Sequence, residues 1–389
     1  MARSKASPSV FKRLLTPPRG SFFLLGPRGT GKTTWLCAHF GGAPSINLLD
    51  EGKYQSLLHS PARFYEELSV HPDGSWVTVD EIQRLPNLLN EVHRLIEDKK
   101  FKFALTGSSA RKLKRAGVNL LAGRAVRRYF FPLTPMEMGH AFDLQKALQF
   151  GTLPLVVQAA DPKDTLLSYV QMYLKEEIQA EAIVRNLSGF SRFLPIAALF
   201  HGQALNISNV ARDAEISRPT ANGFFEILED TLLAQRLPAF ESQLRVREKK
   251  HPKFYWMDPG LVRAVKKEFF PPTQEEMGPL FEGFVYMLLC FQRETFQEID
   301  EISYWAPAES KLTEVDFLLQ MGRDRVAIEV KATSRLRPEH FVGLQAISEL
   351  PGLKRKILVY LGKEKLVKEG GIEVLPFSDF VQELSHRRL

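Results

Sequence analysis

Apolar residues near the start of the chain fall into short runs of strand length, and each run ends in a polar loop. Residues 21–25 form the first run, and a glycine-rich loop and the helix-like segment 34–40 follow it. Two later runs, 76–79 and 101–105, end in acidic and in hydroxyl side chains. Buried strands that alternate with loops and helices in this way predict an α/β core.

A helical pattern follows between about residues 143 and 186, where apolar residues recur at spacings of three and four. These residues are Leu166, Leu167, Val170, Tyr173, Leu174 and Ile178. The pattern predicts a short helical segment that is separate from the strand-rich start of the chain.

A helix–turn–helix pattern is centred on residues 215–217. Residues 207–214 and 218–228 predict its two helices, and Ser217 suits the N-cap of the second helix, which has a proline in its first turn. Residues 232–237 then predict the first strand of a wing. The whole segment therefore predicts a winged helix.

Two strand-like runs flank a turn in the last third of the chain, at residues 311–319 and 325–332. A hairpin centred in that turn places Asp316 directly opposite Glu329, because both are equally far from its centre. Side chains alternate along a strand, so Lys331 shares a face with Glu329. The hairpin therefore predicts two carboxylates and an amine on one surface.

Length and composition are those of a globular protein of about two to four domains. The chain has 389 residues, of which 44% are apolar, and no apolar run approaches the roughly 18 residues of a membrane span. Cys37 and Cys290 lie far apart in apolar surroundings, as expected of small core residues in a reducing compartment. The first residues lack the apolar core of a signal peptide. We therefore expect a cytoplasmic protein without membrane contact.

Basic residues are unevenly distributed, although the net charge of +7 is modest for this length. The stretch 99–136 contains no Asp or Glu, and its basic residues are Lys99, Lys100, Lys102, Arg111, Lys112, Lys114, Arg115, Arg124, Arg127 and Arg128. A second basic run covers residues 245–250 and is followed by Lys253. Two such runs favour a polyanion partner, although basic faces also meet acidic proteins or solvent alone.

The loop after the first strand reads G-x-x-x-x-G-K-[ST], the phosphate loop of nucleotide-binding proteins. Its glycines allow successive backbone N–H groups to turn toward a phosphate at the positive end of the next helix. Lys32 would reach the β- and γ-phosphates, and the Thr33 hydroxyl would help to hold Mg²⁺. We expect ATP and Mg²⁺ on the residues Gly26, Pro27, Arg28, Gly29, Thr30, Gly31, Lys32, Thr33 and Thr34.

Two acidic residues follow the strand-like run 76–79, at the place where a P-loop ATPase needs them. Asp80 would support the Mg²⁺ shell, and Glu81 would polarise the attacking water as a general base. The next strand-like run ends at Thr106 and Ser108, which are equal candidates for contacting the γ-phosphate. Either hydroxyl could instead shape the turn.

These motifs together resemble the prokaryotic AAA-type ATPase family that is related to archaeal ATPases. The resemblance rests on Gly-Pro-Arg-x-x-Gly-Lys-Thr-Thr, Asp-Glu-Ile-Gln, Leu-Thr-Gly-Ser-Ser, Leu-Ala-Gly-Arg and Pro-Leu-Thr-Pro-Met-Glu. It implies an AAA+-like core and a homo-oligomer, with a hexamer as one candidate and ATP sites near subunit boundaries. It also implies that Arg124 stabilises charge during hydrolysis, in its own site or a neighbour's. A surface arginine that faces DNA or a carboxylate is the alternative.

The hairpin with Asp316 and Glu-Val-Lys at 329–331 resembles the PD-(D/E)XK nuclease superfamily, including Holliday-junction resolvase-like members. The segment 280–285 resembles the first helix of that core, with Glu282 as its acidic residue. The resemblance implies that Glu282, Asp316 and Glu329 hold a metal ion and that Lys331 assists at the phosphate. A surface ion pair, or a DNA-binding platform without cleavage, is the alternative.

We therefore expect an α/β protein whose AAA+-like P-loop core, with a parallel sheet, covers residues 1–131. A helical lid would follow at 132–190, a winged helix at 191–268, and a nuclease-like α/β domain at 275–389. In the family that this chain resembles, the C-terminal half is usually a domain of unknown function. A lid of this kind closes over the nucleotide and links hydrolysis to movement.

The polar start of the second helix in the helix–turn–helix is the expected contact with a DNA major groove. These residues are Ser217, Arg218, Thr220 and Asn222. Phosphate contacts near the wing are expected from Arg245, Arg247, Lys249 and Lys250. Winged helices also serve as protein-docking modules, which leaves a protein partner open.

Two functions are consistent with these features. The first is an ATP-hydrolysing protein that binds and remodels DNA, with branched DNA and DNA repair as one candidate setting. The second is a nucleotide-dependent switch that docks a protein partner and carries a catalytically silent nuclease-like domain. The effect of DNA on ATP turnover separates the two.

Overall fold

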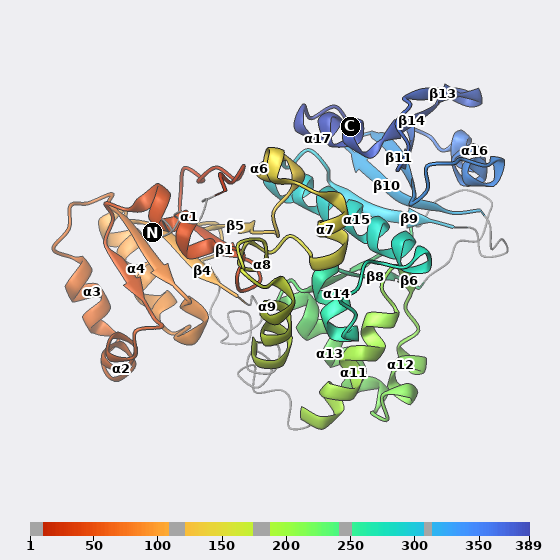
Figure 1. The fold of residues 1–389 in the computed structure, drawn as a ribbon. Helices are drawn as coiled ribbons and strands as arrows, with labels where there is room; N and C mark the ends of the chain where they lie inside the picture. Colours follow the sequence, from red (N-terminus) through yellow and green to blue (C-terminus); the bar gives the residue numbers. More distant parts are fainter. Residues whose placement is uncertain (1–10, 109–120, 174–186, 241–250, 307–312) are drawn as a thin grey trace, which may run out of the picture.

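The described chain forms two lobes that are joined near residue 130. The computed structural model describes residues 11–108, 121–173, 187–240, 251–306 and 313–389. The first lobe holds strands β1 to β5, and the second holds all later helices and strands (Figure 1).

The first lobe is built on a five-stranded sheet with the order β2-β3-β4-β1-β5, in which all paired strands are parallel. Its strands are β1 Phe22–Leu25, β2 Ser45–Asn47, β3 Trp76–Asp80, β4 Lys102–Gly107 and β5 Val126–Tyr129. Because the strands are parallel, the loops after β1, β3 and β4 open at one edge of the sheet. The prediction of an α/β fold with a parallel-sheet P-loop core is confirmed.

Helices cover both faces of this sheet. They are α1 Lys32–Phe40, α2 Glu51–His59, α3 Ala62–Leu68 and α4 Leu88–Lys99. Side chains alternate along β1, so that Phe22 packs with Trp35 of α1, whereas Phe23 packs in a second cluster with Phe64 of α3 and Val92 of α4. The sheet is therefore buried on both sides, as near-continuous apolar strands require.

The second lobe begins with short helices, and they include the described part of the segment 143–186, where a helical pattern was expected. They are α6 Pro135–Met138, α7 Leu144–Phe150, α8 Pro154–Val157 and α9 Pro162–Ser168, with a π-helical turn at Tyr169–Tyr173. A left-handed glycine, Gly151, ends α7, and prolines begin α8 and α9, where a missing N–H costs nothing. Leu174 and Ile178 lie outside the described residues.

Two helices form the predicted helix–turn–helix. These are α12 Ile207–Asp213 and α13 Arg218–Asp230, and the Ser217 hydroxyl accepts the Thr220 N–H at the start of α13. Helix α11 Leu187–Leu199 packs against both. A three-stranded sheet of order β6-β8-β7 follows, with strands β6 Gln203–Ala204, β7 Ala234–Leu237 and β8 Lys253–Trp256. Strand β7 begins two residues later than predicted, because Leu232 adopts a positive φ of 60°.

A six-stranded sheet closes the chain, with the order β13-β14-β12-β11-β10-β9. Its strands are β9 Glu301–Trp305, β10 Val315–Met321, β11 Asp324–Lys331, β12 Leu353–Tyr360, β13 Leu366–Lys368 and β14 Ile372–Pro376. The helices that pack against this sheet include α15 Gln274–Phe296, α16 Val342–Ala346 and α17 Phe377–Ser385, whereas α14 Pro259–Lys266 packs against α7 and β8. Strands β9, β10 and β11 are antiparallel, whereas β11, β12 and β14 are parallel.

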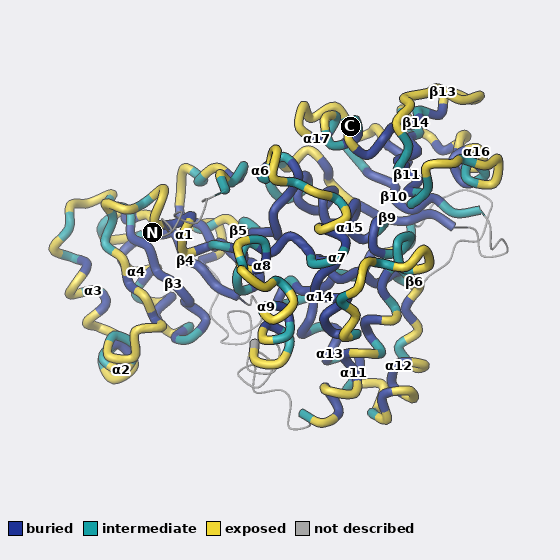
Figure 2. The backbone as a smooth tube through the Cα atoms, viewed as in Figure 1, coloured by how far each residue is buried: buried dark blue, intermediate teal, exposed yellow. Residues whose placement is uncertain are grey.

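One apolar cluster runs through the whole second lobe, from Phe131 to Leu384. It includes Leu148 of α7, Phe225 of α13 and Phe284 of α15, and Figure 2 shows the buried backbone through α15 and the neighbouring strands. Phe130 belongs instead to a cluster of the first lobe. The segments of the predicted lid, winged helix and C-terminal domain therefore share a core, and the apolar clusters of the two lobes divide between Phe130 and Phe131.

Two expectations about the surface have different outcomes. Cys290 is buried, but Cys37 is exposed on α1, because α1 turns only one face toward the sheet. Among the helices of the described residues, none is long and apolar enough to cross a membrane.

Candidate functional site

The phosphate loop joins β1 to α1 at the edge where the parallel strands end. Gly29 and Gly31 have φ of 77° and 88°, a conformation that favours glycine. A Cβ at Gly26 would lie 2.4 Å from the Phe130 carbonyl oxygen, so only glycine fits there. The buried Lys32 Nζ donates to the carbonyl oxygens of Gly26, at 2.7 Å, and Pro27, at 3.0 Å. The lysine thus lies along the loop that it is predicted to serve.

Two hydroxyls and one carboxylate meet beside the phosphate loop. Thr33 Oγ1 donates to Asp80 Oδ2 at 2.7 Å, and Thr106 Oγ1 donates to Asp80 Oδ1. Oxygen donors of this kind are the ligands that Mg²⁺ takes in nucleotide sites, usually together with phosphate oxygens and water. Thr33 and Asp80 therefore fit the predicted magnesium site, and Thr106 reaches the acidic residue from the neighbouring strand.

Glu81 is held by a residue that the sequence analysis did not single out. It has a φ of 58° directly after β3, and its N–H donates to Thr106 Oγ1 at 3.2 Å. The amide of Gln83 donates to Glu81 Oε2 and, at 2.9 Å, to Ser108 Oγ. Both sequence candidates, Thr106 and Ser108, therefore lie at this edge. The Asp-Glu-Ile-Gln run contained the signal for Gln83.

A cavity of about 590 Å³ lies beside the phosphate loop. Its walls come from the N-terminal segment, α1 and α8, and its lining includes Arg13, Gly31, Thr34, Trp35, Leu155 and Gln158. The Leu155 N–H donates to the Gly29 carbonyl at 3.3 Å, and the Tyr169 hydroxyl donates to the Arg28 carbonyl at 3.1 Å. The second lobe therefore touches the phosphate loop directly.

Arg13 ties this cavity to both lobes. Its guanidinium donates to the Thr30 carbonyl at 2.9 Å, to the Phe131 carbonyl at 2.7 Å and to Glu137 Oε1 at 2.9 Å. Burial lowers the pKa of Arg13, although Glu137 opposes this effect. A lone arginine before the first strand gave no sequence signal, because its partners are 17 to 124 residues away.

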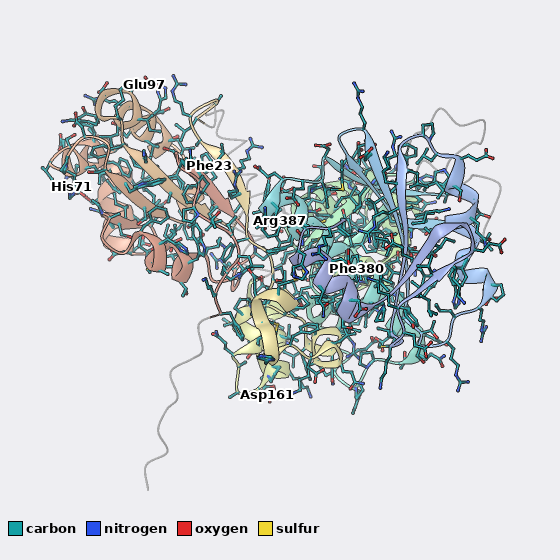
Figure 3. All side chains as sticks on the ribbon, turned by 90° about the horizontal axis from the view of Figure 1, so that it is seen from above. Phe23, His71, Glu97, Asp161, Phe380 and Arg387 are labelled. Atoms are coloured by element: carbon teal, nitrogen blue, oxygen red, sulfur yellow. The ribbon has the colours of Figure 1, made fainter. Side chains whose placement is uncertain are left out.

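Arg124 lies at the wrong end of the sheet to serve its own subunit's nucleotide site. Strand β5 is parallel to β1 with Phe22 opposite Val126, so Arg124 precedes β5, whereas the phosphate loop follows the other end of β1. Its Nε donates to Glu97, at the far side of the first lobe from Asp161 of the second lobe (Figure 3). This contact matches the alternative for Arg124, a surface arginine that faces a carboxylate.

The predicted DNA-contacting residues of α13 are only partly available. Ser217 and Thr220 cap the helix, with their hydroxyls 2.7 Å apart. Asn222 donates to Glu226 at 2.7 Å and accepts from Arg236 at 3.2 Å. Arg218 is exposed. The predicted phosphate contacts Arg245, Arg247, Lys249 and Lys250 lie outside the described residues.

The predicted carboxylates of the C-terminal hairpin lie together. In the β10–β11 pairing, Phe317 lies opposite Ile328. Asp316 and Glu329 are the next residues along the two strands, beyond this last pair. Asp316 Oδ2 accepts the Val330 N–H at 2.9 Å, and Glu329 Oε2 accepts the Asp316 N–H at 3.3 Å. Lys331 Nζ contacts Glu329 and lies 4.0 Å from Asp316 Oδ2. Both acidic residues are buried.

A second lysine stands among these acidic residues. The buried Lys253 Nζ lies 3.0 Å from Glu282 Oε1 and 3.4 Å from Asp316 Oδ1, and it also contacts Glu314. Within the described residues, no three His, Cys, Asp or Glu side chains are arranged to hold a metal ion. The Lys253 ammonium group lies between Glu282 and Asp316, two of the three residues that were expected to hold a metal ion.

Three protein families match successive parts of the chain. An AAA domain matches residues 19–139, and two domains of unknown function, DUF8612 and DUF4143, match residues 141–270 and 277–380. The first of the two covers most of the expected lid and all of the expected winged helix. The second covers the whole six-stranded sheet and does not identify a nuclease.

Similar curated proteins are uncharacterized. A Mycobacterium tuberculosis protein is 24% identical over 368 residues, which are 91% of this chain and 79% of that protein. A Methanocaldococcus jannaschii protein is 25% identical over 335 residues, which are 77% of this chain and 72% of that protein. These relatives extend the similarity well beyond the first lobe.

Solved structures resemble the chain weakly. The Aeropyrum pernix ORC1 protein in complex with DNA has a TM-score of 0.25 and 13% identity, over 65% of this chain and 88% of that one. Protein VC1899 of Vibrio cholerae has a TM-score of 0.24 and 10% identity, over 95% and 97%. Scores this low support no functional argument. The sheet order and the family match together show that residues 19–139 form an AAA-type P-loop nucleotide-binding domain.

Proposed function

We propose that this protein hydrolyses ATP in the first lobe and couples the reaction to contact with DNA. The observation that carries the proposal is the meeting of Thr33, Asp80 and Thr106 beside the phosphate loop, with Glu81 next to them. The group is contributed by the start of α1 and by the ends of β3 and β4, at one edge of the parallel sheet. An ordinary glycine loop before a helix would not need these partners.

Each residue at this edge has a distinct role in the proposal. The backbone N–H groups of the loop and Lys32 bind the phosphates, and Thr33 and Asp80 hold Mg²⁺. When bound, the metal ion neutralises charge that develops on the phosphates. Glu81 orients and deprotonates the attacking water, and Thr106 positions the acidic residues. Gln83 fixes the Glu81 carboxylate between turnovers.

The cavity beside the loop would receive the nucleoside part of ATP. We expect Leu155→Trp to weaken nucleotide binding at least about tenfold, because the indole would fill a cavity that Leu155 lines next to Gly29. Titration with a fluorescent ATP analogue measures the change. Met172→Trp is the matched control, since Met172 is exposed and does not line the cavity. Equal affinity of both variants for the analogue would place the nucleoside elsewhere.

Contact with DNA is supported by the helix–turn–helix and the uneven basic charge. Arg218 is exposed at the N-terminal end of α13, the end that a recognition helix turns toward the major groove. The side chains of Ser217, Thr220 and Asn222 form hydrogen bonds within the protein. Few side chains of the helix would therefore remain for contacts with bases. We therefore propose binding that rests mainly on phosphates and DNA shape, including branched forms.

We expect duplex, single-stranded or four-way junction DNA to raise ATP turnover at moderate salt, since phosphate contacts weaken as salt rises. Arg218→Ala should weaken this DNA effect roughly tenfold and leave the turnover without DNA unchanged. Arg63→Ala, an exposed arginine on α3, is the charge-matched control. If no DNA form binds or stimulates, the DNA part of the proposal is wrong and the ATPase part stands.

A nucleotide-dependent switch that docks a protein is the second candidate function. The internal hydrogen bonds of Ser217, Thr220 and Asn222 favour it, because these residues were the expected base contacts. A pull-down from nuclease-treated lysate tests it. Partners that remain after the nucleic acid is destroyed would support the switch, and partners that disappear would argue against it.

A further inference from the structure

Lys253 is the first residue of β8 in the three-stranded sheet. Its ammonium group nevertheless lies among acidic side chains beside the six-stranded sheet. The ammonium group contacts Glu282 of α15, Asp316 of β10 and Glu314, which directly precedes β10. Its side chain is only 6% exposed. An ammonium group has three N–H donors and no acceptor, so three carboxylates match its donors one for one.

The arrangement suits an ammonium ion and not a second cation. Mg²⁺ requires oxygen ligands at about 2.0–2.1 Å in near-octahedral geometry. A metal ion bound by Glu282 and Asp316 would stand where Lys253 Nζ already lies, 3.0 Å and 3.4 Å from their oxygens. Two cations cannot share that space without strong repulsion in a buried site.

Two lysines offset half of the negative charge of this acidic cluster. Four acidic residues, Glu282, Glu314, Asp316 and Glu329, face two lysines, Lys253 and Lys331. Tyr255 donates a further hydrogen bond to Glu282.

We propose that Lys253 takes the cation position of this nuclease-like cluster, so that the C-terminal domain holds no catalytic metal ion and does not cut DNA. The lysine instead fastens β8, and with it the helix–turn–helix segment, to α15 and β10. Buried ion pairs of this kind fix one packing arrangement while adding little net stability. The proposal does not depend on ATP hydrolysis in the first lobe.

Manganese binding tests the proposal directly. The full-length protein carries Asp80→Asn in every sample, which weakens metal binding in the first lobe, and free Mn²⁺ is counted by electron paramagnetic resonance. We expect Lys253→Met to gain about one Mn²⁺ site, because it leaves an uncompensated group of hard oxygen donors. The additional Asp316→Asn change should remove that site. If Lys253→Met folds and gains no site, the lysine does not occupy a cation position.

A second comparison keeps the test valid if Lys253→Met fails to fold. With Lys253 intact, Asp316→Asn should leave Mn²⁺ binding unchanged, and no DNA form should be nicked with Mg²⁺ or Mn²⁺. Manganese binding or nicking that Asp316→Asn abolishes would overturn the proposal and restore the nuclease. Lys32→Ala should change neither Mn²⁺ binding nor nicking. A wrong proposal about Lys253 can therefore be distinguished from a wrong proposal about ATP hydrolysis.

Discussion

Glu81→Gln should slow ATP hydrolysis at least roughly 100-fold while nucleotide binding stays nearly unchanged. A positioned general base contributes about 10²- to 10⁴-fold to a rate, and glutamine keeps the shape of the side chain while losing its basicity. Thr33 and Asp80 contact each other without Glu81, so the proposed metal ligands remain in place. Single-turnover hydrolysis and equilibrium binding of a fluorescent ATP analogue measure the two effects separately.

Lys32→Ala is the contrasting variant for this prediction. Its ammonium group is expected to contact the phosphates, so its loss should weaken binding itself. Binding that is retained in Glu81→Gln and lost in Lys32→Ala would separate the chemical role from the binding role. Hydrolysis by the glutamine variant at the parental rate would show that another group activates the water.

Much of the first lobe could be predicted because its information is local. The phosphate loop follows β1 directly, and the acidic pair and the hydroxyl residues lie at the ends of β3 and β4. In a parallel sheet such positions meet at one edge, so sequence order fixes their proximity. The hairpin of β10 and β11 is local in the same sense, and its register follows from the centre of its turn.

Contacts between segments that lie far apart along the chain could not be predicted from the sequence. Lys253 looked like the end of a surface basic run, and only the approach of β8 to α15 brings it to Glu282, 29 residues away. Arg13 was missed because its partners lie on other elements. The pattern at 143–186 showed apolar periodicity, but Gly151 and the prolines at 154 and 162 divided it into short helices.

Asp258 connects the end of α7 to the start of α14. Its replacement should have a large effect on how stability depends on pH. Its buried carboxylate accepts the Thr152 N–H at 2.7 Å, after α7, and the Leu261 N–H at 3.1 Å, at the start of α14. A Cβ at Gly151 would lie 1.9 Å from Asp258 Oδ1, which shows how closely the segments approach. Burial raises the pKa of Asp258 from 3.8 to about 6, against its backbone hydrogen bonds.

A raised folded-state pKa means that the folded protein binds this proton more tightly than the unfolded chain does. The resulting stability is complete below about pH 4 and is lost as the pH rises through about 6. Between pH 7 and pH 5, Asp258 should therefore add about 1.4 kcal/mol to the free energy of unfolding of the second lobe. Asp258→Asn should remove this part of the pH dependence.

Denaturant unfolding of both proteins at pH 5 and pH 7 measures the effect, because the other titrating groups cancel in the comparison. Asp143→Asn is the matched control, since Asp143 caps α7 in the same way but is exposed. We expect the free energy of unfolding of the Asp143 variant to change between pH 5 and pH 7 as that of the parent does. The Asp258 variant should lack the extra stability that the parent gains at pH 5. If the Asp258 variant kept the parent's full pH dependence, protonation of this carboxylate would not stabilise the contact between α7 and α14. That contact would then depend on apolar packing.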